Sequence, residues 1–570
     1  MKNTLSTLFV ILVPLIFFQN CESPRKKSEK QLPPNIILIL ADDMGYSDIG
    51  CYGGEINTPA LDQLAMNGLR FTQFYNGARC CPSRASLLTG LYPQQAGIGH
   101  MVYDRGMPAF RGDLSSNAVT IAEALKKGGY STFMSGKWHI TPYVIDKPDK
   151  SNWPGQRGFD KFYGMISGAG SHYDPRSLAE DNDYVPPSED FYSTTAFTDY
   201  AVKCIKEHKG DSPFFLYLSY PAPHWPLQAP SEAIAKYKGK YDKGWDVMRK
   251  TRFERMKKMG LANEDWELSP RDSFVKPWSE NLPDKAWERA NMETYAAMTT
   301  LMDEGIGQVV DALEAKGQLE NTVIFYLQDN GACAEELDWI KNRPAGKEVV
   351  AMVPDEIQTE MIPFSSRDGK PVKIMKEGWP GPAEGYTAYG LNWANASNTP
   401  FREYKHWVHE GGIATPLIVH WPSKIKKGGE LRKSPTHLID IMTTCMDISG
   451  LEYPANYNGN TIHPMEGTSL VPALEGKDLN REAIYWEHEG NRAVRMGKWK
   501  LISKASKINS YLWDKTAELE LKDWELFDME RDRTEMHDMA ATNPEMVKTM
   551  AQMWLEWGKR TGIVPRPEKK

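Results

Sequence analysis

Short, uninterrupted apolar runs recur along the chain, and they constrain its fold more than any other feature. The run at residues 35–41, Asn-Ile-Ile-Leu-Ile-Leu-Ala, has no polar residue after its first position. Comparable runs lie at residues 213–220, 322–327 and 415–421. A strand that is apolar at nearly every position is buried on both faces, as in a parallel sheet covered by helices.

Segments with helical signals lie between these runs. Thr58-Pro59 provides a cap residue and a proline at the first helical position, and the helix expected over residues 120–127 is closed by two glycines. Residues 130–134 predict a further strand, and residues 437–448 a further helix. One helical face carries Tyr295, Met298, Thr299, Met302 and Ile306. Strands alternate with helices, which predicts an α/β fold with a largely parallel sheet.

The pattern changes near residue 475. The antiparallel strands expected beyond it are residues 483–487, 492–495 and 498–502. Residues 543–559 predict a helix. The chain has 570 residues, which is too long for one ordinary core. We therefore expect a main domain over residues 34–475 and a smaller C-terminal α+β unit over residues 476–570.

Two segments interrupt the alternation of strands and helices in the main domain. Residues 231–290 are charged and rich in Lys, Trp and Met, and residues 335–398 carry many Gly and Pro. Long connections of this kind often build the walls of an active site. We expect both to pass over the edge of the sheet.

Residues 1–20 have the features of an export signal peptide. Lys2 is followed by an apolar run from Leu8 to Phe18, which is shorter than the roughly 20 residues of a transmembrane helix. Cys21 comes directly after the signal and resembles the lipobox cysteine that is acylated in bacterial lipoproteins. Residues 21–33 are polar and basic and predict a tether. We expect an exported protein of the periplasm or cell surface, either an outer-membrane lipoprotein or a plain secreted protein.

The composition excludes several classes of protein. A net charge of −7 with no long basic block gives no reason to expect a nucleic-acid partner. Seven cysteines are too few for a disulfide scaffold of this size. With 41% hydrophobic and 25% charged residues, the chain is neither wholly disordered nor a polytopic membrane protein.

Acidic pairs directly follow two of the predicted buried strands. Asp42-Asp43 follows the first strand, and Asp329-Asn330 follows the strand that begins at residue 322. Ligands bind beyond the carboxyl ends of parallel strands, so both pairs should meet at one edge of the sheet. Three carboxylates and an amide oxygen suit Ca²⁺ or Mg²⁺. Each pair alone could equally be a turn or a helix cap.

Three cationic motifs also follow strands or lie in loops. They are Gly136-Lys137-Trp138-His139, Pro223-His224-Trp225-Pro226, and Lys405 ahead of His409-Glu410-Gly411-Gly412. Taken singly, each of these motifs has an ordinary structural interpretation, such as a core histidine or a surface lysine.

The segment from residue 80 to residue 90 is the most specific motif in the chain. It reads Cys80-Cys81-Pro82-Ser83-Arg84-Ala85-Ser86-Leu87-Leu88-Thr89-Gly90. This segment resembles the sulfatase signature, Cys-x-Pro-x-Arg followed by an apolar pair and Thr-Gly. In that family a maturation enzyme oxidises the first cysteine, here Cys80, to formylglycine (3-oxoalanine). A buried cysteine pair or a disulfide would not account for the residues that follow.

The resemblance is closest to type I, formylglycine-dependent sulfatases of the bacterial arylsulfatase-like group. It extends to the three cationic motifs, to residues 398–402 and to residues 495–502. It implies an alkaline-phosphatase-like α/β fold, with a mixed, mostly parallel sheet flanked by helices and a smaller C-terminal α+β domain. The implied ligands of one Ca²⁺, with Mg²⁺ less favoured, are Asp42, Asp43, Asp329, Asn330 and the modified Cys80.

The resemblance also implies a role for each cationic residue. Arg84 would hold the hydrated aldehyde, Lys137 would bind it and the sulfate, and His139 would act on its second hydroxyl group. His224 and Lys405 would bind sulfate and protonate or steer the leaving alcohol. Fixed cations and a general acid are what such a reaction requires.

The implied reaction is hydrolysis of an organic sulfate ester to an alcohol and inorganic sulfate, through a covalent sulfo-enzyme intermediate. Export favours a sulfated glycan from a host or an alga as substrate, and His100 and His172 could line the sugar site. The alternatives are a small aryl sulfate hydrolase, a phosphonate or phosphate ester hydrolase on the same fold, and a glycan-binding protein with a decayed site. Both histidines could equally be ordinary loop residues.

Overall fold

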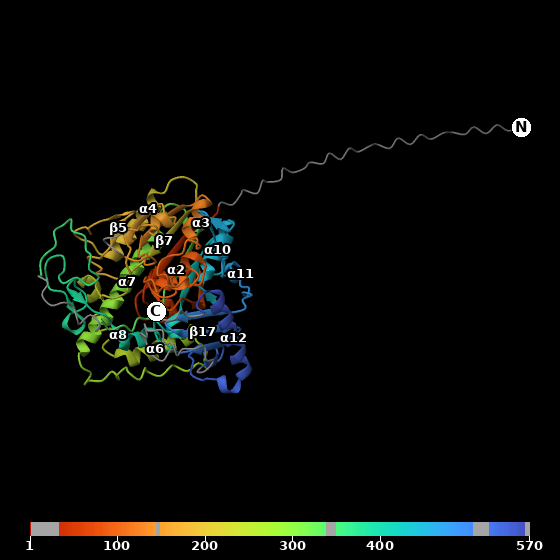
Figure 1. Ribbon diagram of the computed structural model, residues 1–570. Coiled ribbons are helices and arrows are strands. Elements are labelled where there is room, and N and C mark those ends of the chain that lie inside the picture. Colours follow the sequence, from red (N-terminus) through yellow and green to blue (C-terminus); the bar gives the residue numbers. More distant parts are fainter. Residues whose placement is uncertain (2–32, 144–148, 338–348, 505–523, 565–570) are drawn as a thin grey trace.

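The computed structural model describes residues 1, 33–143, 149–337, 349–504 and 524–564 (Figure 1). Apart from their first and last positions, the predicted signal peptide and tether, including Cys21, lie outside the described residues. In the described part of the chain, no helix is long and apolar enough to cross a membrane.

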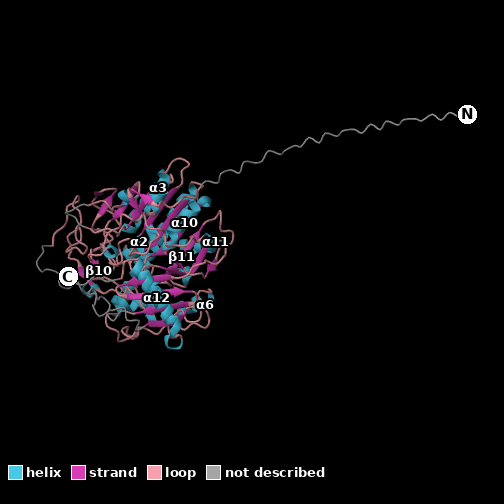
Figure 2. Ribbon diagram, turned by 45° about the vertical axis from the view of Figure 1, so that its right-hand side comes forward, coloured by secondary structure: helices cyan, strands magenta, loops and turns pink. Residues whose placement is uncertain are grey.

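The main sheet has eleven strands within the described residues and lies between helices (Figure 2). At its centre β1 (Asn35–Ala41) is parallel to β7 (Phe214–Ser219) on one side and to β8 (Thr322–Gln328) on the other. All three strands are buried along their whole length, which confirms the strands predicted from the apolar runs. The other strands are β2 (Leu69–Tyr75), β3 (Ser131–Gly136), β4 (Lys161–Met165), β5 (Leu178–Glu180), β6 (Asp183–Tyr184), β11 (Ala414–His420), β12 (Glu430–Arg432) and β13 (Thr436–His437).

Most neighbouring strands are parallel, but β11 is antiparallel to both β2 and β8, and β5 is antiparallel to β4 and β6. The strand predicted at residues 415–421 therefore exists, although it runs against its neighbours. Its sequence could not give the direction, because a strand buried on both faces has the same apolar pattern in either orientation. The sheet is mixed and mostly parallel, as predicted.

Alternate residues of β1 contact different sets of helices. Leu38 and Leu40 lie in the core with α2, α3 and α10, whereas Ile37 and Ile39 lie in the core with α1, α4 and α7. These helices are α1 (Pro59–Asn67), α2 (Cys80–Thr89), α3 (Ile121–Lys127), α4 (Ser193–Glu207), α7 (Lys285–Ala315) and α10 (Ile439–Ser449). The period-two alternation of a strand thus builds two helical layers on one sheet.

The two segments expected to interrupt the alternation contain helices of their own. Residues 231–290 include α5 (Ser231–Ala235), α6 (Gly244–Lys258) and the start of α7. Residues 335–398 include β9 (Lys373–Ile374), β10 (Gly385–Tyr386) and α8 (Gly390–Ser397). Arg252 of α6 is fully buried and contacts Asp48 (2.6 Å) and Glu55 (2.8 Å), so α6 is joined to the loops that follow β1.

The C-terminal part contains a separate four-stranded antiparallel sheet, with α12 (Pro544–Arg560) beside β17 (Figure 1). Its strands are β16 (Ile484–His488), β17 (Asn491–Met496), β18 (Trp499–Ser503) and β19 (Trp524–Asp528). The buried Lys500 of β18 contacts Glu410 (2.8 Å) and Glu535 (2.7 Å), which ties this sheet to the helix α9 (Glu410–Ile413). The α+β character is as predicted, and the domain boundary at residue 475 stays a prediction.

Buried histidines make the fold sensitive to acid. Burial, aided by the charge of Arg481, lowers the pKa of His437 from 6.5 to about 3. Between these values the unfolded chain binds a proton that the folded chain does not, so stability falls as the pH drops below about 6.5. At pH 5 this one residue costs about 2 kcal/mol. In urea unfolding at pH 7.5 and pH 5, His437→Asn should therefore lose less stability between the two pH values than the wild type. Equal losses of stability in the wild type and the variant would show that His437 does not cause the acid sensitivity.

Candidate active site

The carboxyl ends of β1 and β8 bring the two acidic pairs together. The backbone N–H of Asp43 donates to a carboxylate oxygen of Asp329 (3.3 Å). The side-chain nitrogen of Asn330 donates to Oδ1 of Asp43 (2.6 Å). Asp42, Asp43, Asp329 and Asn330 are all at most 2% exposed. The structure therefore places the four residues in one cluster, at the edge of the sheet where the sequence predicts them.

Two cations from separate elements contact this acidic cluster. Arg84 of α2 donates through Nη2 (2.9 Å) and Nε (3.2 Å) to Oδ2 of Asp329, and its Nη2 lies 3.5 Å from Asp42. Lys137 follows β3 and donates through Nζ to Asp42. Although burial raises the pKa of Asp42, the cations, with Lys137 foremost, lower it to about 2. Asp42 is therefore ionised at neutral pH.

Two further predicted residues contact the cluster through Asp43. Lys405 Nζ lies 3.0 Å and His224 Nε2 lies 3.3 Å from Oδ2 of Asp43. The other ring nitrogen of His224, Nδ1, donates to the carbonyl of Trp225 (2.6 Å), which leaves Nε2 facing the site. Residues distant in sequence thus converge from five loops and from α2 on one buried centre.

Cys80 is the first residue of α2, and the sulfatase-like segment forms this helix. Gly90 ends α2 in the left-handed region, with a φ of 68°. Cys80 and Cys81 are both buried, and the Sγ of Cys81 lies 3.1 Å from Nε2 of His139. A hydrogen bond with Cys81, together with nearby His139 and Lys137, holds the pKa of the Cys80 thiol well below its usual value. The site therefore favours an anion at position 80.

The acidic cluster has the features of a site for a hard cation. Oδ1 of Asp42 and Oδ1 of Asn330 are buried and have no hydrogen-bond partner among the described residues. Burial and the Asp42 carboxylate raise the pKa of Asp329, so these neighbouring anions need more positive charge than the protein supplies. Unpaired carboxylate and amide oxygens are the donors that Ca²⁺ and Mg²⁺ prefer. The residues present therefore fit a divalent cation.

Two residues that support the cationic groups were not predicted from the sequence. Ser219, the last residue of β7, accepts from Nη1 of Arg84 (2.5 Å) and donates to the carbonyl of Lys137 (2.8 Å). Glu335 lies 3.7 Å from Lys405 Nζ and accepts from the indole N–H of Trp225 (2.9 Å). Ser219 ends an apolar run at the same sheet edge, and this position in the sequence could have identified it as a site residue. No sequence pattern marks Glu335.

His172 and His100 lie near the centre but contact protein groups. The ring nitrogens of His172 are 2.7 Å from Ser193 Oγ and 3.1 Å from the carbonyl of His224. His172 therefore supports the loop that carries His224. Nε2 of His100 lies 3.3 Å from the carboxylate of Glu489, in the turn between β16 and β17. The predicted contacts of both histidines with a sugar stay predictions.

Gly168 leaves room for the ring of His139. A Cβ atom at Gly168 would lie 2.0 Å from the imidazole, and His139 itself has a φ of 58°. We predict that Gly168→Ala displaces His139 and lowers kcat for an aryl sulfate by about tenfold or more, with little change in KM. Steady-state kinetics test this, and Gly155→Ala, where a Cβ atom has 3.7 Å of clearance, is the matched control. An unchanged kcat for Gly168→Ala would show that the position of this ring does not matter.

Comparisons with known proteins agree with the family resemblance of the residues in this centre. Residues 34–451 match the family model for sulfatase, and residues 402–560 match the model for the C-terminal part of N-sulphoglucosamine sulphohydrolase. An arylsulfatase from Klebsiella aerogenes is 33% identical over 80% of this chain and 95% of its own length. An N-acetylglucosamine-6-O-sulfatase from Bacteroides thetaiotaomicron is 25% identical over 95% of this chain and 88% of its own.

A solved structure has the same fold. It is described as Ps i-CgsB in complex with k-i-k-neocarrahexaose, and it superposes with a TM-score of 0.61 at 25% identity over 92% of each chain. The family model covers most of the chain, and the Klebsiella aerogenes relative is similar along nearly all of its length. The chain therefore belongs to the sulfatase family and is a sulfuric ester hydrolase with an alkaline-phosphatase-like fold.

Proposed function

We propose that the protein removes sulfate from sulfated glycans outside the cytoplasm, using a formylglycine made from Cys80 and one bound Ca²⁺. The observation that carries this proposal is the position of Cys80. It lies at the start of α2 in a buried centre with Arg84, Lys137 and His139, beside acidic residues with unpaired oxygens. Such a centre can hold a sulfate group and an anionic nucleophile together.

Each group in the proposed mechanism has a defined chemical role. A hydrated formylglycine supplies two hydroxyl groups on one carbon, one to attack sulfur and one to expel sulfate afterwards with return of the aldehyde. Asp42, Asp43, Asp329 and Asn330 would hold one Ca²⁺, which would supply positive charge to this anionic centre. The hard oxygen donors suit Ca²⁺, and Mg²⁺ is the less favoured ion.

The residues of the chain bind the sulfate and move the protons. Lys137 and Lys405 contact different carboxylates of the acidic cluster, Asp42 and Asp43, so their ammonium groups can contact the oxygens of a sulfate bound there. His224 or Lys405 donates the proton that the leaving alcohol needs. Burial lowers the pKa of His139 to about 4, so it is neutral at pH 7 and can take the proton of the second hydroxyl group.

The names of the relatives support a glycan as substrate. One relative is named an N-acetylglucosamine-6-O-sulfatase, and one solved structure holds an oligosaccharide. The proposal has three further parts, which are export through residues 1–20, a lipid anchor at Cys21 and a formylglycine-generating maturation enzyme.

Sulfate release tests the substrate class. The protein, coexpressed with a formylglycine-generating enzyme, would be given singly sulfated sugars, an aryl sulfate and a phosphonate monoester. The proposal predicts release from a sugar at one position and slower turnover of the phosphonate. Release from the aryl ester alone would contradict the glycan assignment, and faster turnover of the phosphonate would contradict the sulfatase chemistry. Membrane fractionation of Cys21→Ser tests the anchor, because unchanged membrane association would exclude it.

A further inference from the structure

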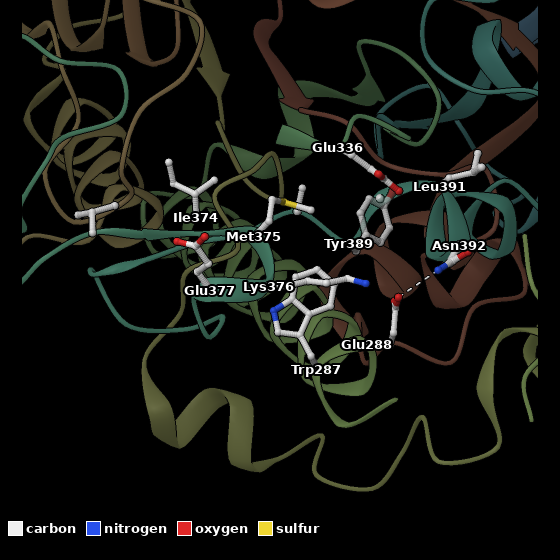
Figure 3. A pocket seen from close by; sticks show the side chains of 13 residues that line it. Trp287, Glu288, Glu336, Ile374, Met375, Lys376, Glu377, Tyr389, Leu391 and Asn392 are labelled. Carbon is white, nitrogen blue, oxygen red and sulfur yellow. Dashed lines mark hydrogen bonds between the residues drawn. The ribbon is translucent and has the colours of Figure 1, made fainter. Parts of the chain in front are cut away.

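A cavity of about 660 Å³ lies outside the catalytic cluster, between three segments of the chain (Figure 3). Its wall is formed by the start of α7, by residues 372–377 around β9, and by residues 388–392 at the start of α8. We call it the Glu288 cavity. Its volume lies within the range of small-molecule sites.

Glu288 places a carboxylate with an unused oxygen in this wall. Its side chain is buried, with the residue 6% exposed, and one oxygen accepts from the side-chain nitrogen of Asn392 (3.0 Å; Figure 3). The other oxygen, Oε2, is buried and has no hydrogen-bond partner in the described part of the chain. A buried carboxylate oxygen without a donor is costly, and a ligand in the cavity can supply that donor.

The charge of the wall favours a cationic ligand. Glu336 and Glu377 line the cavity together with Glu288. Lys376 is the one cation among the lining residues that the structure describes, and its Nζ is already paired with Asp284 (2.9 Å). Burial raises the pKa of Glu288 to about 7, and a bound cation would stabilise its ionised form. A sulfate or carboxylate group would be repelled by the same wall.

The aromatic part of the wall is rigid. The indole N–H of Trp287 donates to the carbonyl of Gly378 (3.0 Å). The ring of Tyr389 stacks on Tyr295, with 4.7 Å between centroids and 12° between the planes. Fixed aromatic rings beside carboxylate and amide groups suit a sugar, whose C–H face packs on the rings while its polar groups meet the carboxylates.

The Glu288 cavity adjoins a second cavity that reaches the catalytic centre. The second cavity has a volume of about 900 Å³ and is lined by Lys405, which contacts Asp43. The two cavities share Glu336 and Leu391 in their walls. Phe274 lines the second cavity and is 83% exposed, so an apolar ring is available in the wall that also contains Lys405. One ligand chain could therefore occupy both cavities.

We propose that the Glu288 cavity binds an unsulfated amino sugar, in a glycan whose sulfated sugar lies at Lys405. This inference rests on the proposed glycan sulfatase function and adds the chemistry of the neighbouring sugar. The ammonium group of the amino sugar donates to Oε2 of Glu288 in a charge-assisted hydrogen bond. The ring packs on the wall formed by Trp287 and Tyr389.

Binding of an unsulfated probe tests this proposal. Glucosamine tetrasaccharide would be titrated calorimetrically into the mature protein at pH 7.5, beside N-acetylglucosamine tetrasaccharide, which lacks the ammonium groups. We expect the glucosamine probe to bind about tenfold more tightly or better. Glu288→Gln should remove this preference. Glu314→Gln, which changes an exposed glutamate on the same helix, should keep it.

Several results would overturn the proposal. They are no binding of the glucosamine probe, equal affinity for the two probes, or an unchanged preference in Glu288→Gln. Thermal unfolding checks that the variant is folded, and Glu336→Gln gives a second variant that should weaken the same preference. Because this binding requires no sulfate ester, failure of the sulfate-release panel and failure of this test are separate results.

Discussion

The Cys80→Ala protein is expected to release no measurable sulfate from an aryl sulfate, a loss of about 1000-fold or more in kcat/KM. In the proposed mechanism residue 80 is the nucleophile, and alanine offers no oxygen to attack sulfur. Cys80 is buried at the start of α2, and its replacement removes one sulfur atom while Lys137 keeps its contact with Asp42. The fold should therefore survive, as circular dichroism and thermal unfolding would show.

Two further variants sharpen this test. Cys204→Ala changes a buried cysteine on α4, away from the centre, and should keep full activity. Cys80→Ser could attack sulfur once but has no second hydroxyl group to expel sulfate, so it should give a single turnover and then stop. Sustained turnover by Cys80→Ala would rule out the formylglycine mechanism. Mass spectrometry of the peptide around residue 80 in the active protein should show the aldehyde or its hydrate.

Removing the divalent cation is expected to abolish activity and lower the unfolding temperature. The cluster of Asp42, Asp43 and Asp329 contains buried anions close together, and Oδ1 of Asp42 has no partner within the described residues. A cation that binds only the folded state stabilises it by about 3 kcal/mol at 100 times its Kd. A thermal shift assay measures this stabilisation when the protein is first chelated and then titrated with Ca²⁺ or Mg²⁺. We expect Ca²⁺ to restore more of the lost unfolding temperature than Mg²⁺.

The same assay on variants shows where the ion binds. Asp42→Asn should lose both activity and the Ca²⁺-dependent shift, whereas Asp211→Asn, at an exposed position, should keep both. An unchanged Ca²⁺ shift in Asp42→Asn would place the ion elsewhere. A protein stripped of metal that keeps its unfolding temperature and its activity would contradict the proposed cofactor.

The central strands of the fold could be predicted because burial on both faces requires apolar residues at nearly every position. Residues 35–41 and 322–327 show this pattern, and β1 and β8 are found there. β2 was missed because Arg70 and Gln73 interrupt its apolar pattern and are only partly buried. The short strands β5 and β6, at one end of the sheet, have too few residues to show a period. The direction of a strand could not be predicted from the sequence either, as the antiparallel strand β11 shows.

The site could be predicted where its residues directly follow strands or lie in a specific motif. Asp42, Asp329 and Lys137 follow β1, β8 and β3, and the order of a parallel sheet brings such positions together. Glu489 could not be predicted, because it reaches the centre from the turn of the C-terminal sheet. Its carboxylate lies 2.5 Å from Nη1 of Arg79, the residue before Cys80. Contacts between separate sheets leave no periodic signal in a sequence.

An isotope experiment shows whether the sulfur–oxygen bond of the ester breaks, as attack on sulfur by residue 80 requires. The mature protein would hydrolyse 4-nitrophenyl sulfate in water enriched in oxygen-18, and both products would be analysed by mass spectrometry. Attack at sulfur by a hydrated aldehyde at residue 80 predicts that the label enters the released sulfate and is absent from the nitrophenol. Label in the nitrophenol would mean that the carbon–oxygen bond breaks, and it would contradict the role assigned to Cys80 and to the cations around it.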